Sequence, residues 1–158
     1  MNSEARVERA LKSFRGGYGC AQSVMLAYSD IYSEELTALL KISSGFGGGM
    51  GRLQSYCGAL TAIFMIAGME EGSVEPGDDS KDILASVIQE ATLLFEEMNG
   101  SSDCYQLIDL DLNNADERQL HKEGGIRQKV CEKCVESAVQ IVDIISLHKK
   151  EIANGEKQ

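Results

Sequence analysis

Five cysteines carry most of the chemistry that this sequence offers: Cys20, Cys57, Cys104, Cys131 and Cys134. A cysteine thiolate attacks disulfides and ligates iron or zinc. Because the number of cysteines is odd and the chain is not a small secreted scaffold, a structural disulfide framework is not expected. The sequence instead predicts reactive thiols or metal ligands.

Three of these cysteines follow signals for the start of a helix. Cys20 comes after Gly-Gly-Tyr-Gly, Cys57 after a glycine-rich segment, and Cys104 after Asn-Gly-Ser-Ser-Asp. The first turn of a helix offers unpaired N–H groups and about half a unit of positive charge, and both stabilise a thiolate. We therefore expect these thiols to be reactive, with burial in the core as the alternative, since free cysteine is a common core residue.

Cys131 and Cys134 form a CxxC motif, and the i, i+3 spacing puts both thiols on one face of a helix. They would be able to share a metal or to form a redox pair. A thioredoxin-like CxxC stands at the start of a helix after a strand, whereas this one falls inside a helical region. Cys134 also lies on an apolar stripe with Val135 and Ala138, so core packing is its expected role.

Residues 45–51 include five glycines, and such a segment does not form a stable helix interior. We expect a loop whose backbone bends sharply or approaches another group closely. A P-loop would continue with Gly-Lys-Ser/Thr, whereas Arg52 follows here, so close packing around Cys57 is favoured over phosphate binding. The glycines that are candidates for contact with a cofactor are Gly47, Gly48, Gly49 and Gly51.

The elements that must position the cysteines are helices. Apolar residues recur with a helical period almost throughout, and no convincing apolar–polar alternation is present. Helices are expected from Ser3 to Gly16, from Cys20 to about Tyr28, after a cap at Ser33, from Cys57 to Met69, from Asp79 or Ser80 to Asn99, briefly after Ser102 or Asp103, and after Gly125. Residues 113–123 are polar and only weakly helical, and His121 and His148 are expected to be solvated.

The composition limits the classes of function. The 158 residues suit one domain, which we place at 1–150 with a frayed polar tail at 151–158. A net charge of −10 disfavours nucleic acid and anionic membranes, which attract basic surfaces. No signal peptide or span of about 20 apolar residues is evident. We therefore predict an all-α, compact, single-domain bundle in reducing cytoplasm, without membrane insertion.

The ordered set of motifs resembles the C_GCAxxG_C_C family, small redox-active proteins of bacteria and archaea. The matching segments are Gly19-Cys20-Ala21-Gln22, Gly47 to Gly51 leading into Cys57-Gly58-Ala59, Cys104 with Leu107, Asp111 and Leu112, and Cys131 with Val135 and Ala138. The resemblance implies that Cys20, Cys57, Cys104 and Cys131 are the family cysteines and that Cys134 is additional. Ala62 stands where the last glycine of CGAxxG is expected.

Two functions follow from these observations. In the first, Cys20, Cys57, Cys104 and Cys131 gather near the glycine loop and act in redox chemistry. They would do so either by thiol–disulfide exchange with a redox partner protein or as ligands of an iron–sulfur cluster or zinc. In the second, the chain is a helical module without turnover that binds structural zinc or a protein partner. The sequence does not decide which cysteines pair.

Overall fold

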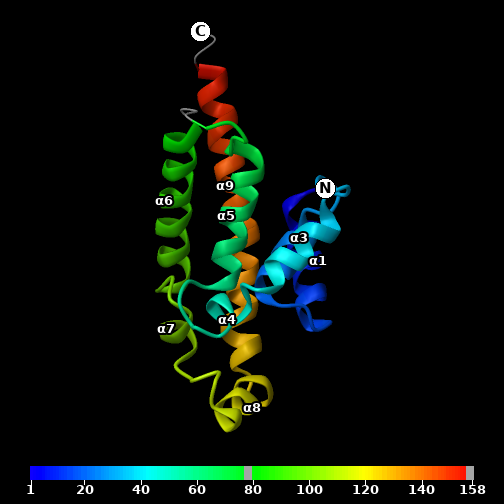
Figure 1. Ribbon diagram of the computed structural model, residues 1–158, viewed down its shortest axis with the longest axis vertical. Helices are drawn as coiled ribbons and strands as arrows, with labels where there is room; N and C mark the ends of the chain where they lie inside the picture. Colours follow the sequence, from blue (N-terminus) through cyan, green and yellow to red (C-terminus); the bar gives the residue numbers. More distant parts are fainter. Residues whose placement is uncertain (77–79, 156–158) are drawn as a thin grey trace.

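The computed structural model describes residues 1–76 and 80–155, and this part of the chain contains helices and no strand, as predicted (Figure 1). The helices are α1 (Ser3–Arg15), α2 (Cys20–Ala27), α3 (Leu36–Ser44), α4 (Gly47–Met50), α5 (Gly58–Glu71), α6 (Ser80–Asn99), α7 (Cys104–Ile108), α8 (Ala115–Glu123), the π-helical turn η1 (Arg127–Cys131) and α9 (Glu132–Gly155). A single antiparallel bridge joins Tyr56 and Asp103.

The long helices α5, α6 and α9 pack against one another, and α1 and α2 pack against α9 from the side (Figure 1). Figure 1 also shows α8 at one end of the molecule, beyond the start of α9. The core is apolar, and its largest fully buried side chains include Phe14, Met25, Leu60, Phe95 and Ile141. Within the described residues, no helix is both long enough and apolar enough to cross a membrane.

The helix caps differ from the sequence expectation at two places. Helix α1 is capped by Asn2, whose Oδ1 accepts the Ala5 N–H at 2.9 Å, and Ser3 is the first helical residue. Helix α3 has Glu35 at its N-cap, so the expected cap at Ser33 is wrong. The chain there first makes a turn in which the N–H groups of Ile31 and Tyr32 bond to the Tyr28 carbonyl.

Other helix starts agree with the sequence, and one segment is better ordered than expected. Asp103 caps α7, since its Oδ1 accepts the Gln106 N–H at 2.9 Å. Asn114 caps α8 by accepting the N–H groups of Asp116 and Glu117, so residues 115–123 form a regular helix. A polar side chain at the N-cap stabilises a short helix that periodicity predicts only weakly. Helix α6 begins at Ser80, while Asp79 lies outside the described residues.

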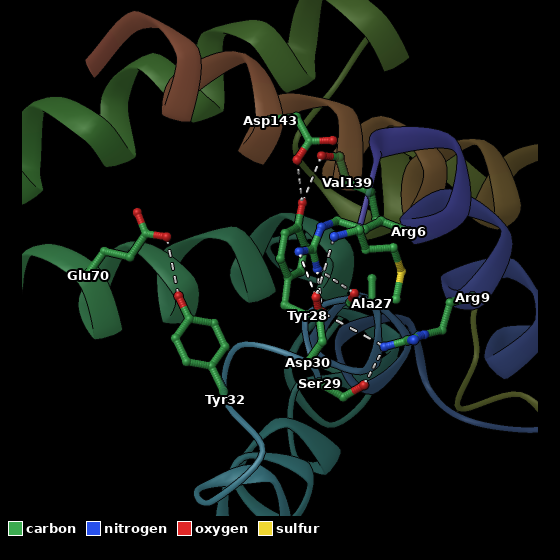
Figure 2. Close-up of polar contacts among 11 residues, drawn as sticks. Arg6, Arg9, Ala27, Tyr28, Ser29, Asp30, Tyr32, Glu70, Val139 and Asp143 are labelled. Carbon is green, nitrogen blue, oxygen red and sulfur yellow. Dashed lines mark hydrogen bonds and ion pairs between the residues drawn. The ribbon is translucent and has the colours of Figure 1, made fainter. Parts of the chain in front are cut away.

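A partly buried polar network joins α1, α2 and α9 (Figure 2). The Arg6 guanidinium donates to the Ala27 carbonyl at 2.8 Å and to both carboxylate oxygens of Asp30 at 2.8 and 3.1 Å. It also lies 4.5 Å from the centre of the Tyr28 ring, whose hydroxyl donates to the Val139 carbonyl at 3.0 Å. Buried polar groups must be paired, so this network fixes the first two helices on α9.

Candidate functional site: a cluster of thiols

Three helices start at the predicted cysteines. Cys20 is the first residue of α2, Cys57 is the N-cap of α5, and Cys104 is the first residue of α7. Cys131 ends the π-helical turn, and Cys134 lies in the first turn of α9. A π turn holds one more residue than an α turn and re-aims the side chains around it, and such turns are frequent at functional sites.

The segments that precede α5 and α7 lie side by side and bring two helix starts together. The Cys57 N–H donates to the Ser102 carbonyl at 2.8 Å, and the Cys104 N–H donates to the Ser55 carbonyl at 2.7 Å. Cys20 lies close to the start of α5 because the residue after Cys57, Gly58, has no side chain. A Cβ at Gly58 would lie 3.3 Å from the Cys20 Cβ and 2.7 Å from the Phe46 carbonyl oxygen.

The glycine segment is a compact turn of left-handed helix, where the sequence predicted a loop. Gly48, Gly49, Met50, Gly51 and Arg52 all have φ between 63° and 65°. This conformation is open to glycine and costs other residues about 1–2 kcal/mol, which explains the glycine content. The turn satisfies its own backbone, because the Met50 N–H bonds to the Phe46 carbonyl.

This turn packs directly on the cysteines, which was one of the two roles expected of it. A Cβ at Gly49 would lie 2.6 Å from the Cβ of Cys104. Gly49 is therefore buried against protein, whereas nothing lies within 4 Å of a Cβ added at Gly47. Gly47, Gly48 and Gly51 line a surface groove of about 500 Å³ that is described below.

The thiols interact in two pairs. Cys134 interacts with Cys57, and Cys131 interacts with Cys20. The interaction with Cys134 lowers the pKa of Cys57, and the backbone N–H groups of Ala59 and Leu60 lower it further, against the opposing effect of burial. The pKa values of Cys131 and Cys134 rise, because the interaction with its partner thiol favours the protonated form of each and because both are buried.

Cys104 stands beside the pairs without a thiol partner of its own. Burial raises its pKa to about 12, and the nearby charges of Cys57, Cys20 and Asp103 act in the same direction. It is therefore a neutral thiol at neutral pH. All five cysteines are free thiols, and Cys20 is only partly buried, whereas the others are buried.

Comparison with known families identifies the family of this chain. The model of the family described as "Putative redox-active protein (C_GCAxxG_C_C)" matches residues 18–145, which include all five thiols. The chain belongs to the C_GCAxxG_C_C family. Comparison with curated proteins and with solved structures gave no match. The family description supports redox activity and names no substrate.

Two residues of this C_GCAxxG_C_C protein have roles in the cluster that the sequence did not predict. Cys134 lies in the apolar core, as expected, and it also interacts with Cys57. His121 was expected to be solvated, yet its Nε2 lies 3.3 Å from the Cys131 Sγ. Burial lowers the pKa of His121, as do the charges of Arg127 and Lys122, so its imidazole is neutral at neutral pH. The CxxC spacing was the only sequence signal for Cys134, and none pointed to His121.

The described residues show no set of side chains gathered around one metal ion. A structural zinc or an iron–sulfur cluster takes four ligands at a common centre. No group of three or more His, Cys, Asp or Glu side chains in residues 1–76 and 80–155 is positioned to hold a metal ion. The ligand set of Cys20, Cys57, Cys104 and Cys131 therefore stays a prediction from the sequence.

Proposed function

We propose that this C_GCAxxG_C_C protein is a thiol–disulfide exchange protein in which Cys20 and Cys131 form the working pair. One observation carries the proposal. The half-buried Cys20 at the start of α2 is paired with a buried thiol, Cys131, which also contacts an imidazole. Exchange needs an accessible attacking sulfur, a second sulfur within reach of it and a group that moves a proton.

The reaction has two steps. The Cys20 Sγ, as thiolate, attacks one sulfur of a substrate disulfide, forms a mixed disulfide and releases the other sulfur as a thiolate. Cys131 then passes its proton to the Nε2 of neutral His121, and its thiolate attacks the Cys20 Sγ. The second substrate sulfur leaves and takes the proton held by His121, while the first takes a proton from solvent. Two electrons move to the substrate, which becomes two thiols, while the protein gains one disulfide.

Cys57 and Cys134 form a second pair deeper in the protein. The charge of Cys57 acts on Cys131, and the charge of Cys20 acts on Cys134, which places the two pairs close together. In the proposed reaction, the inner dithiol reduces the Cys20–Cys131 disulfide by the same exchange. The two dithiols of the fully reduced protein would then supply four electrons in all. Cys104 would remain a thiol because it has no partner thiol.

The decisive experiment traps the mixed disulfide. The reduced protein is treated with a small aromatic disulfide, and the adducts are measured by mass spectrometry. The wild type is expected to release both substrate thiols, whereas Cys131→Ser should stop with one substrate sulfur bound to Cys20. Cys104→Ser is the matched control and should behave as the wild type. If Cys131→Ser released both substrate thiols and gave no adduct on Cys20, the assignment of Cys20 and Cys131 as the working pair would be refuted.

The metal hypothesis and the hypothesis of a module without turnover are separated from exchange by two further measurements. Protein purified without oxygen is analysed for iron and zinc, and its thiols are counted before and after mild oxidation. The exchange proposal predicts that mild oxidation lowers the number of free thiols from five to one. Peptide maps should then contain the disulfides Cys20–Cys131 and Cys57–Cys134. Stoichiometric metal that is lost in Cys20→Ser would overturn exchange, as would five thiols that do not react.

A further inference from the structure

Beside the thiol pairs lies a groove whose charge is opposite to that of the whole protein. We call it the cationic groove, with a volume of about 500 Å³, the size of many small-molecule sites. The left-handed turn forms part of it through Gly47, Gly48 and Gly51, and α8 contributes Arg118 and Lys122. Figure 1 shows α8 at the lower end of the molecule and α4 above it.

Four basic side chains line the cationic groove: Arg52, Arg118, Lys122 and Arg127. The lining includes no Asp or Glu, and none of the ion pairs found in the described part of the chain uses these four cations. Glu132 interacts electrostatically with Arg127, but its carboxylate is bonded to Arg15 at 2.6 Å.

Structural hydrogen bonds account for only two of these four basic side chains. Two of the four cations have structural bonds, since Arg118 donates to the Leu112 carbonyl and Arg127 donates to the Phe14 carbonyl. Arg52 and Lys122 are exposed, and neither side chain forms an ion pair with a carboxylate of residues 1–76 or 80–155. In a chain of net charge −10, cations without carboxylate partners that gather in one concave surface attract anions to that surface.

The cationic groove is connected to the thiols through His121. This side chain lines the groove, and its Nε2 lies 3.3 Å from the Cys131 Sγ. Gly19, the residue before Cys20, also lines the groove. An anion held by Arg52 and Lys122 would therefore sit next to the working pair.

We propose that the cationic groove binds a small, multiply charged anion, and that the substrate of Cys20 is an anionic low-molecular-weight disulfide. The second half of this statement rests on the function proposed above, whereas the first half does not. Carboxylate or phosphate groups of the substrate would bind the four cations, and its S–S bond would face Cys20. Both released thiols would carry the same negative groups and would leave the groove by exchange with solvent anions.

Two variants with the same loss of charge provide the test. The groove variant is Arg52→Gln with Lys122→Gln, which removes the two exposed cations and spares those with structural bonds. The control is Lys41→Gln with Lys81→Gln, two exposed lysines on α3 and α6 outside the groove. Calorimetry with citrate measures anion binding directly. Binding by the wild type and the control, and its loss in the groove variant, are expected.

Reduction rates of two disulfides of opposite charge test which class of substrate the protein prefers. The reduced protein is given 3,3′-dithiodipropionate, which is anionic, or cystamine, which is cationic, and each rate is divided by that of dithiothreitol with the same disulfide. The wild type and the control should prefer the anionic disulfide by at least about tenfold, a preference that high salt weakens. The groove variant should lose most of this preference for the anionic disulfide. Citrate should inhibit only the reduction of 3,3′-dithiodipropionate.

The outcomes keep the two proposals apart. Citrate binding without reduction of either disulfide would leave the anion site standing and overturn the exchange function. Reduction of both disulfides without charge preference, together with no citrate binding, would overturn the anion site and leave exchange standing. An equal loss in the control and the groove variant would show an effect of net charge alone and would also overturn the site.

Discussion

Gly49 is the residue through which the left-handed turn contacts the thiol cluster, and Gly49→Ala measures how tightly that contact is packed. The new Cβ would lie 2.6 Å from the Cβ of Cys104, 2.9 Å from the Cα of Gln54 and 2.9 Å from the backbone nitrogen of Ser55. Real Cβ atoms do not approach other atoms so closely, and two of these neighbours are backbone. The turn or α7 must therefore move.

The expected cost has two parts. A residue other than glycine at φ +64° loses about 1–2 kcal/mol. Excess volume in a packed site adds about 1–3 kcal/mol, so Gly49→Ala should reduce the free energy of unfolding by about 2–5 kcal/mol. That is a large share of the stability of a single domain, which is about 5–15 kcal/mol.

Urea unfolding of the reduced protein, followed by circular dichroism, measures this loss. With a slope of about 2 kcal/mol/M, the midpoint should fall by about 1–2.5 M. Gly47→Ala is the matched control in the same turn, because nothing lies within 4 Å of its added Cβ. It should change the stability by at most about 1 kcal/mol. Equal effects of the two substitutions would refute the packing argument.

Three further predictions concern the polar network and the reactivities of Cys20 and Cys104. Burial raises the pKa of Asp30, but the hydrogen bond and charge of Arg6 outweigh it and the pKa is lowered, so stability is lost as pH falls through this folded-state pKa. Asp30→Asn should flatten the fall of the melting temperature below about pH 4, and an unchanged slope would contradict this. Tyr28→Phe, which removes the hydroxyl bonded to α9, should reduce the free energy of unfolding by about 1–2 kcal/mol in urea, and an unchanged midpoint would count against the network. Iodoacetamide at neutral pH should modify Cys20 first and leave Cys104 unmodified in peptide maps, because Cys104 is buried and its pKa is about 12, whereas early labelling of Cys104 would exclude this.

Local sequence patterns were sufficient to predict the helices and the helix starts at three of the cysteines. Both depend on neighbours in the chain, since periodicity, caps and glycines act over a few residues. Cys20, Cys57 and Cys104 could therefore be assigned to helix N-termini from the amino-acid order alone. The same local rules failed at Ser33, where a turn anchored on the Tyr28 carbonyl delays α3.

Packing between distant segments selects which sulfurs and which cations are neighbours. Cys131 contacts His121 and interacts with Cys20 because the π turn ends where α8 and α2 meet the start of α9. The paired role of Cys134 and the cationic groove arise in the same way. Each needs side chains from segments far apart in the sequence, and a periodic pattern carries no information about where such segments meet. Helix formation is a local equilibrium, whereas the redox geometry of this protein depends on how its helices pack.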